Sequence, residues 1–331
     1  MKVVIDSAIP YLKGLLEPYS EVVYRAGQAF TPEDVADADA LIVRTRTKCN
    51  AELLENSKVR FIATATIGFD HIDLDYCARR GIKVVTAQGC NAAGVLQWVS
   101  AALAMLSERD GWSPEQMTLG VVGVGNVGSL VERYAREWGF RVLCCDPPRQ
   151  AREGGDFVTF EQVMRGSDIV TMHTPLNDTT YHLLRAESIG LMKDSGVIIN
   201  ASRGEVADTE ALLAAPQTLL IDVWEREPKI DTRLLEKAFV ATPHIAGYSA
   251  QGKANAAMMV IEALAEEFGL PLKGWYPAEV KPVSRAEISW AEMCATISNY
   301  CNLKDETNCL KSNPMGFEQM RDNYAYREEY F

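Results

Sequence analysis

The sequence lacks a long hydrophobic run and any excess of positive charge. No apolar stretch in its 331 residues reaches the roughly 20 residues that a membrane-spanning helix requires. The segment from Met1 to Asp6 begins directly as a strand rather than as a signal peptide. The net charge of -12 argues against nucleic acid as a partner, because phosphate backbones are bound by clustered lysine and arginine. We therefore expect a cytoplasmic protein that binds neither membranes nor nucleic acid.

The eight cysteines also lack the patterns that mark two kinds of site. They show neither the paired spacing of a zinc site nor the density of a secreted disulfide scaffold. We expect most of them to be small buried hydrophobic residues, and we expect no metal site. Cys144 and Cys145 are adjacent in a predicted strand, so their side chains should point to opposite faces of a sheet.

The length and the rhythm of the chain predict its domains. A chain of 331 residues is too long for one compact core. Short apolar strands alternate with helical stretches, which is typical of parallel sheets covered by helices. We predict an α/β protein with two doubly wound parallel-sheet domains, the first flavodoxin-like and the second of the Rossmann type. The predicted boundaries are residues 1–90 plus 269–282, residues 91–268, and a short helical C-terminal extension at residues 283–331.

Two details of this organisation concern the end of the chain. A helix from Ser249 to Phe268 should lead back toward the first domain. Beyond Pro282 there are two amphipathic helical patches, Ile288 to Tyr300 and Phe317 to Tyr330. Patches this short cannot form a core of their own, so they should serve as an interface or as a lid on the main body.

The segment from Leu119 to Asp146 has the order of parts that binds a dinucleotide: strand, glycine-rich turn, helix, strand and acid. The glycines allow a tight turn, a close approach of the backbone to a pyrophosphate, and close helix packing. Free amide hydrogens at the start of the helix would hold the phosphates. The turn and the helix start consist of Gly123, Gly125, Asn126, Val127 and Gly128. Asp146 would bind a ribose hydroxyl and favour NAD over NADP, because its charge repels a 2′-phosphate.

Three polar side chains follow consecutive later strands of the second domain. Arg203, Glu227 and His244 come after the strands that end near Asn200, Asp222 and Ala241. The carboxyl ends of parallel strands form the ligand-binding edge of such a sheet. An imidazole can accept the proton of an alcohol during hydride transfer. A carboxylate against its other nitrogen orients the ring, and an arginine fork matches a substrate carboxylate.

Each of the three also has a plain structural interpretation. His244 could be a hydrogen-bonded structural residue, Glu227 a solvated loop acid, and Arg203 a surface residue beside a turn glycine. Their joint position at one sheet edge favours a catalytic role. His173 is a competing base, although it precedes a segment that we expect to contact the cofactor.

The first domain has a cationic loop after one of its strands. Arg44, Arg46 and Lys48 place three cations within five residues, and a loop from Thr64 to Asp70 follows another strand. Cations, amides and hydroxyls at strand ends suit a phosphate or a carboxylate. A solvated basic loop in an acidic protein is the alternative.

Three segments of the second domain are similar to the signatures of a known family. Asn200 to Gly204, Asp222 to Pro228 and Thr242 to Tyr248 resemble those of the D-isomer-specific 2-hydroxyacid dehydrogenases. The similarity covers about residues 1–282 and returns at residues 317–329. More narrowly, the chain resembles members of the family that act in vitamin B6 biosynthesis.

The resemblance implies NAD-dependent oxidation of a small phosphorylated 2-hydroxyacid by a homodimer. By analogy, Arg203 and Glu227 are active-site residues and His244 is the proton donor or acceptor. The implied substrate contacts are Thr45, Thr66 and Tyr248, to which the cationic loop adds Arg44 and Arg46. The implied NAD contacts are Asp146, Thr174, Ala201, Ser202, Arg203, Asp222 and Gly247. Residues 282–331 are fewer than the dimerisation domain expected of these members, so the dimer interface should be reduced.

Three other functions compete with this one. The first is oxidation of another 2-hydroxyacid, such as a glycerate or a phosphoglycerate, although the cationic loop favours a phosphate. The second is an NAD-sensing regulator that keeps the fold without chemistry. The third is a methyltransferase with a similar glycine turn, which has no reason to keep an arginine, a glutamate and a histidine together.

Overall fold

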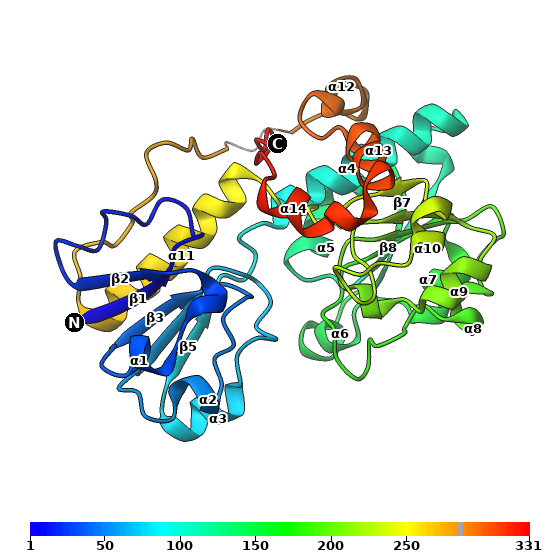
Figure 1. Ribbon diagram of the computed structural model, residues 1–331. Coiled ribbons are helices and arrows are strands. Elements are labelled where there is room, and N and C mark those ends of the chain that lie inside the picture. The colour runs from blue at the N-terminus through cyan, green and yellow to red at the C-terminus, as the bar shows by residue number, and fades with distance from the viewer. Residues whose placement is uncertain (284–286) are drawn as a thin grey trace. The chain divides into compact units, whose positions relative to one another are not determined.

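The computed structural model describes residues 1–283 and 287–331, which form two compact units. Unit 1 comprises Met1–Asn91 and Ser249–Pro282, and unit 2 comprises Ala92–Tyr248 and Val283–Phe331. Each unit is built on a parallel sheet with helices on both faces (Figure 1). The predicted fold class is therefore confirmed. Within the described residues, no helix combines the length and the apolar character that spanning a bilayer demands.

Unit 1 is a five-stranded sheet in the order β2-β1-β3-β4-β5, which is the flavodoxin-like order that the sequence predicts. Its strands are β1 (Lys2–Asp6), β2 (Glu21–Arg25), β3 (Ala40–Val43), β4 (Phe61–Thr64) and β5 (Lys83–Thr86). Its helices are α1 (Pro32–Val35), α2 (Ala51–Leu54), α3 (Leu74–Arg80) and α11 (Ala250–Phe268), with a 3-10 turn at Gly27–Ala29.

The alternation of side chains along the strands of unit 1 divides its interior into two cores. Val3 and Ile5 of β1 pack with Val260 and Leu264 of α11 on one face. Val4, between them, packs on the other face with residues of α1, α2 and α3. Successive side chains of a strand point to opposite faces, so an uninterrupted apolar strand is buried on both sides.

Helix α11 belongs to unit 1, whereas the sequence interpretation placed residues up to 268 in the second domain. Ser249 caps its start by accepting a hydrogen bond from the Gly252 amide at 3.0 Å. Gly269 ends it with a positive φ of 68°, a conformation that glycine adopts without strain. Its apolar face is part of the core formed by β1, β3 and β4. The helix does lead back to the first domain, but the boundary lies at its start.

Unit 2 is a six-stranded sheet in the order β11-β10-β9-β8-β6-β7. Its strands are β6 (Thr118–Val122), β7 (Arg141–Cys145), β8 (Ile169–Met172), β9 (Val197–Asn200), β10 (Thr218–Ile221) and β11 (Val240–Ala241). Its helices up to β11 are α4 (Ala92–Asp110), α5 (Asn126–Glu137), α6 (Pro147–Glu153), α7 (Phe160–Gly166), α8 (Ala186–Ile189), α9 (Thr209–Ala214) and α10 (Thr232–Lys237). Two 3-10 turns lie at Pro114–Gln116 and Gly204–Val206.

The two faces of this sheet carry different helices. Helices α4 and α5 cover one face, and α7, α8, α9 and α10 cover the other. Cys144 belongs to the first core and Cys145 to the second, which confirms the predicted opposite orientation. The strand order reverses between β6 and β8, and the site where a doubly wound sheet binds ligands is outside the carboxyl ends of the strands at that point.

The C-terminal extension packs onto unit 2 as three short helices. They are α12 (Trp290–Thr296), α13 (Leu303–Ser312) and α14 (Phe317–Asp322), with 3-10 turns at Ile297–Asn299 and Pro314–Gly316. Met293 joins the core of α4 and α5, whereas Leu310 and Phe317 join the core on the other face. The Thr307 hydroxyl accepts a hydrogen bond from the Ala241 amide of β11 at 3.1 Å.

The extension differs from its prediction in two respects. Helix α13 was not predicted, and the predicted helix from Phe317 to Tyr330 ends at Asp322. The residues after α14 instead make contacts with the body of unit 2. Phe331 is buried and packs edge-on against Tyr134 at a centroid distance of 5.4 Å. Tertiary contacts thus override the helical spacing in this segment.

Candidate active site

The loop after β9 holds Arg203 by a network that begins with a buried asparagine. Asn200 donates through Nδ2 to the Arg203 carbonyl at 3.0 Å and accepts from the Ser202 hydroxyl at 2.8 Å. The Arg203 Nη1 donates to the Ser202 carbonyl at 2.7 Å. A Cβ atom on Gly204 would lie 2.0 Å from the Trp224 carbonyl, so only glycine lets the loops after β9 and β10 approach so closely.

Glu227 and His244 form a hydrogen-bonded pair at the ends of β10 and β11. The His244 Nδ1 lies 2.7 Å from the Glu227 Oε2, and the other carboxylate oxygen accepts the Trp224 amide at 2.9 Å. With Nδ1 donating to the carboxylate, Nε2 is the imidazole nitrogen that can exchange a proton with a substrate. The side chain of His244 is 33% exposed, so a small molecule can reach it.

The ionised form of Glu227 is the stable one. Burial favours its neutral form, but the hydrogen bond from His244, the charge of His244, the Trp224 amide and the charge of Arg321 favour the carboxylate. Their sum lowers the pKa of Glu227 below its ordinary value. The residue therefore offers a negative charge to an imidazolium at neutral pH.

The backbone of His244 has a positive φ of 57°, which a non-glycine residue rarely adopts. Its amide donates to the Asp222 carbonyl at 2.8 Å. The buried Asp222 carboxylate accepts the Thr242 hydroxyl at 2.6 Å and the amides of Ile245 at 2.8 Å and Ala246 at 3.0 Å. Burial raises the pKa of Asp222. In this arrangement the Asp222 side chain, predicted as an NAD contact, supports the loop that carries His244.

The structure thus brings Glu227 and His244 into direct contact. It places Arg203 in the loop after β9, the strand next to β10. Among the described residues, Arg203 makes no ion pair with a carboxylate. Its remaining donors are available to an anion.

The sequence interpretation gave no role to Arg321, which lies in the segment at residues 317–329 that resembles the family. Arg321 lies on α14 and donates to the Glu318 carboxylate at 2.8 Å. Its charge helps to lower the pKa of Glu227. Tyr248 makes edge-on ring contacts with Tyr324 and Tyr326, at centroid distances of 5.9 and 6.1 Å. Sequence spacing could not reveal this neighbourhood, because the residues lie in a different part of the chain.

The glycine turn after β6 has the close contacts that its sequence predicts. Gly123 has a φ of 85°, and a Cβ there would lie 2.7 Å from the His173 carbonyl. A Cβ on Gly128 would lie 2.0 Å from the Gly123 carbonyl, which keeps α5 tight against the turn. A Cβ on Gly125 would meet no described atom within 4 Å. This open, side-chain-free surface at a helix start fits a pyrophosphate.

Two other predicted NAD contacts have different surroundings. The Asp146 carboxylate accepts the Val124 amide and the Arg149 amide, each at 2.8 Å, so it also fixes the glycine turn and caps α6. The Thr174 Oγ1 is buried and has no hydrogen-bond partner among the described residues. A buried hydroxyl of this kind calls for a partner, and a bound dinucleotide would provide one.

His173 is poorly suited to be the catalytic base. Its Nε2 lies 2.9 Å from the Thr171 hydroxyl, and burial lowers the pKa of His173 to about 3. An imidazole that resists protonation cannot accept a proton effectively near neutral pH. This competing interpretation is therefore disfavoured.

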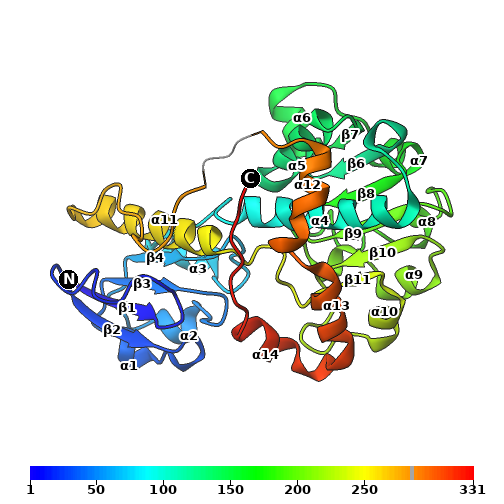
Figure 2. The same cartoon turned by 90° about the horizontal axis from the view of Figure 1, so that it is seen from above.

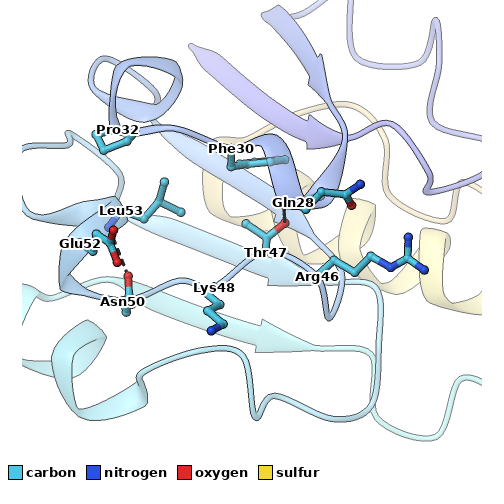
Figure 3. A pocket seen from close by; sticks show the side chains of 10 residues that line it. Gln28, Phe30, Pro32, Arg46, Thr47, Lys48, Asn50, Glu52 and Leu53 are labelled. Carbon is cyan, nitrogen blue, oxygen red and sulfur yellow. Dashed lines mark hydrogen bonds between the residues drawn. The ribbon is translucent and has the colours of Figure 1, made fainter. Parts of the chain in front are cut away.

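The predicted substrate loops of unit 1 follow β3 and β4. Arg44 donates to the Ala8 carbonyl at 3.0 Å, and Thr45 is exposed. Arg46 and Lys48 line a surface hollow of about 340 Å³, and their side chains point in different directions (Figure 3). The buried Thr47 between them donates to the Gly27 carbonyl at 2.9 Å, which fixes the loop.

Thr66 belongs to a hydroxyl network at the end of β4. Its Oγ1 donates to the Gly68 carbonyl at 2.9 Å and lies 2.7 Å from the Thr64 hydroxyl. Thr64 in turn lies 3.1 Å from the Nε2 of His71. The Thr66 side chain is thus held in one place by its own loop.

Comparison with a protein-family model identifies the central part of the chain. Residues 93–246 match the NAD-binding domain of the D-isomer specific 2-hydroxyacid dehydrogenases. These residues include the glycine turn, Asp146, Arg203, Glu227 and His244.

Relatives of known name match almost the whole chain. Erythronate-4-phosphate dehydrogenase of Bacteroides fragilis is 47% identical over 341 aligned positions, which cover 99% of this chain and 97% of that protein. The protein of the same name from Porphyromonas gingivalis is 39% identical, with 99% and 94% covered.

Solved structures of related dehydrogenases have the same fold. D-lactate dehydrogenase from Aquifex aeolicus, in complex with NAD and lactic acid, superposes with a TM-score of 0.65 at 25% identity, covering 82% of this chain and 96% of that one. The NAD-bound 3-phosphoglycerate dehydrogenase of Entamoeba histolytica has a TM-score of 0.69 at 24% identity, covering 83% and 98%.

Proposed function

Because the chain belongs to the D-isomer-specific 2-hydroxyacid dehydrogenase family, we propose that it oxidises 4-phospho-D-erythronate to 3-hydroxy-2-oxo-4-phosphonooxybutanoate. The protein is an NAD-dependent dehydrogenase. The name of its relatives, together with their match along both chains, supports the substrate. We place the reaction in the biosynthesis of vitamin B6.

The observation that carries the proposal is the 2.7 Å contact between His244 and Glu227. NAD, when bound, accepts the hydride that leaves carbon 2 of the substrate. In the proposed step, the Nε2 of His244 takes the proton of the hydroxyl on that carbon. The Glu227 carboxylate stabilises the positive imidazolium that results and keeps the ring in position.

Arg203 is proposed to bind the substrate carboxylate through its planar fork. Fixing the carboxylate would orient carbon 2, which lies next to it, toward His244. We propose that the phosphate and the hydroxyl groups of the substrate are bound by Arg44, Thr45, Arg46, Thr66 and Tyr248.

The proposed NAD site uses backbone more than side-chain charge. The open turn at Gly125 and the unpartnered Thr174 hydroxyl support it. We propose that the site consists of Gly123, Gly125, Asn126, Val127, Gly128, Asp146, Thr174, Ala201, Ser202, Arg203, Asp222 and Gly247.

The substrate proposal is tested by NADH formation with four acids: 4-phosphoerythronate, erythronate, glycerate and 3-phosphoglycerate. We expect the highest kcat/KM with 4-phosphoerythronate, because the phosphate and the four-carbon chain are both recognised. Equal rates with 3-phosphoglycerate or glycerate would contradict this substrate and leave the dehydrogenase assignment intact. No NADH with any of the four would favour an NAD-sensing regulator. Homodimerisation and a cytoplasmic location stay predictions.

A further inference from the structure

The last residues of the C-terminal extension lie against the loop that carries His244. After α14 the chain passes the start of α4 (Figure 2). Gln97 of α4 donates to the Glu328 carbonyl at 2.9 Å, which fixes the position of this segment. The neighbouring Arg327 is buried, with 8% of its surface exposed.

The guanidinium of Arg327 donates to three backbone carbonyls. Its Nη1 lies 3.0 Å from the Ile245 carbonyl. Its Nη2 lies 3.0 Å from the Gly94 carbonyl and also donates to the Ala246 carbonyl. Two of these carbonyls belong to the two residues that follow His244. A guanidinium can reach several acceptors at once because its donors are spread over a rigid plane.

The same two residues are held from the other side by Asp222. Its carboxylate accepts the Ile245 amide at 2.8 Å and the Ala246 amide at 3.0 Å. The Asp222 carboxyl group thus accepts from the N–H groups, and the Arg327 guanidinium donates to the C=O groups, of one short backbone segment. The loop is fixed from both sides, and the hydrogen bonds from the guanidinium are charge-assisted, which are the stronger kind.

This arrangement matters because His244 has a strained backbone. A residue with a φ of 57° keeps that conformation only if its surroundings impose it. The direction of the imidazole follows from the backbone conformation, so loss of the restraint after His244 would let the ring leave its place beside Glu227.

We infer that Arg327 is a positioning residue for His244, and that through it the C-terminal extension serves catalysis in its own chain. This inference rests on the proposed role of His244 as acid and base. Arg327 acts through the Ile245 and Ala246 carbonyls and does not itself touch the reacting groups.

The position of Arg327 is itself determined by neighbours within the extension. Its Nη1 also lies 3.1 Å from the Tyr324 hydroxyl, which donates to the Glu306 carboxylate at 2.6 Å. Helix α13, through Glu306 and Tyr324, thereby holds the segment that holds the catalytic loop. The extension contributes more than a surface for a second subunit.

The test compares Arg327→Lys and Arg327→Gln with Lys311→Gln. Lys311, on α13 of the extension, is the matched control because its ammonium also donates to backbone carbonyls of the main body. These are the carbonyls of Glu236 and Ala238, at 3.1 and 2.7 Å. These carbonyls precede β11 and are not part of the loop after His244. All variants are measured as the full chain.

We expect both Arg327 variants to lower kcat about 100-fold, since a small misplacement of a catalytic group has such an effect. NAD affinity, from fluorescence titration, should fall much less than kcat, because most of the proposed NAD-site residues lie outside residues 243–248. Hydrogen exchange of the peptide covering residues 243–248 should become faster in the Arg327 variants alone. Arg327→Lys keeps the charge and has only one point of attachment, so a folded Arg327→Lys with low kcat supports positioning.

Three results would overturn the inference. They are unchanged kcat in folded Arg327 variants, unchanged exchange at residues 243–248, or an equal loss of kcat in Lys311→Gln. A wild-type protein that oxidises no 2-hydroxyacid would instead defeat the proposed function, and the exchange measurement would still report whether Arg327 holds the loop.

Discussion

At the scale of single residues, the candidate site depends on a balance between burial and hydrogen bonding. Burial alone would raise the pKa of Glu227, yet its contacts with His244 and the Trp224 amide keep its pKa below the ordinary value. Asp222, which is more deeply buried, has a raised pKa despite its three hydrogen bonds. Two carboxyl groups a few residues apart therefore differ in their environments, and only Glu227 contacts the imidazole.

Arg203→Lys tests the arginine at the same scale. A lysine keeps the positive charge but loses the planar fork that binds both oxygens of a carboxylate. We expect kcat/KM to fall by roughly 10- to 100-fold, which corresponds to one lost charge-assisted hydrogen bond. The control is Arg165→Lys on the exposed surface of α7. Unchanged steady-state kinetics in Arg203→Lys would show that Arg203 does not hold the substrate carboxylate.

Sequence reasoning identified Arg203, Glu227 and His244 because each lies in the loop that follows a strand of one sheet. The parallel sheet brings such positions to one edge, and this rule needs no tertiary detail. It could not identify a role for Arg321 or Arg327, because no strand precedes them. The family resemblance implied a cofactor role for Asp222, and the position after a strand did not show that its side chain also accepts the Ile245 and Ala246 amides.

At the scale of elements, different glycines of the turn after β6 serve different purposes: Gly128 allows close packing of α5, and Gly125 leaves space for the proposed pyrophosphate. Gly128→Ala would place a Cβ 2.0 Å from the Gly123 carbonyl, so α5 must move away from the turn. We expect it to lower the free energy of unfolding by about 1–3 kcal/mol, as overpacking does, and to weaken NAD binding. Urea unfolding and NAD titration measure the two effects.

Gly125→Ala is the matched variant of the same turn. Its Cβ would meet no described atom within 4 Å, so stability should be nearly unchanged. NAD affinity should nevertheless fall, because the methyl group would occupy the space proposed for the pyrophosphate. Wild-type NAD affinity in Gly125→Ala would place the phosphates elsewhere.

The strands could be predicted closely from the sequence because they are apolar and bounded by turn residues. The ends of the long helices were also predictable, as at α11, where Ser249 and Gly269 cap the helix. The unit to which α11 belongs could not be predicted, because the apolar pattern of the helix is compatible with packing on either sheet. The end of α14 at Asp322 was missed for a similar reason. Helical spacing continues to Tyr324, but ring contacts with Tyr248 determine where that residue lies.

At the scale of the whole molecule, Glu227 links the site to folding stability. A carboxyl group whose pKa is lower in the folded chain than in the unfolded chain stabilises the fold above the unfolded pKa. This contribution is lost as the pH falls through the folded pKa. The unfolded value for glutamate is about 4.3, so the stabilisation by Glu227 is complete near neutral pH and declines in acid.

Glu227→Gln should therefore be less stable than the wild type at pH 7, and the difference should shrink below about pH 4. Urea unfolding at a series of pH values measures it. Glu187→Gln is the control, because the Glu187 side chain is 79% exposed and a surface ion pair contributes little. A difference between Glu227→Gln and the wild type that does not change with pH would contradict the lowered pKa of Glu227.

The account as a whole depends on proton transfer by His244. The most direct measurement is the turnover of His244→Ala with saturating 4-phosphoerythronate and NAD, alongside its affinity for NAD. The account predicts a kcat lower by about 10²- to 10⁴-fold, the usual contribution of a general base, with NAD still bound. A kcat close to that of the wild type would contradict it and would place the base on another residue.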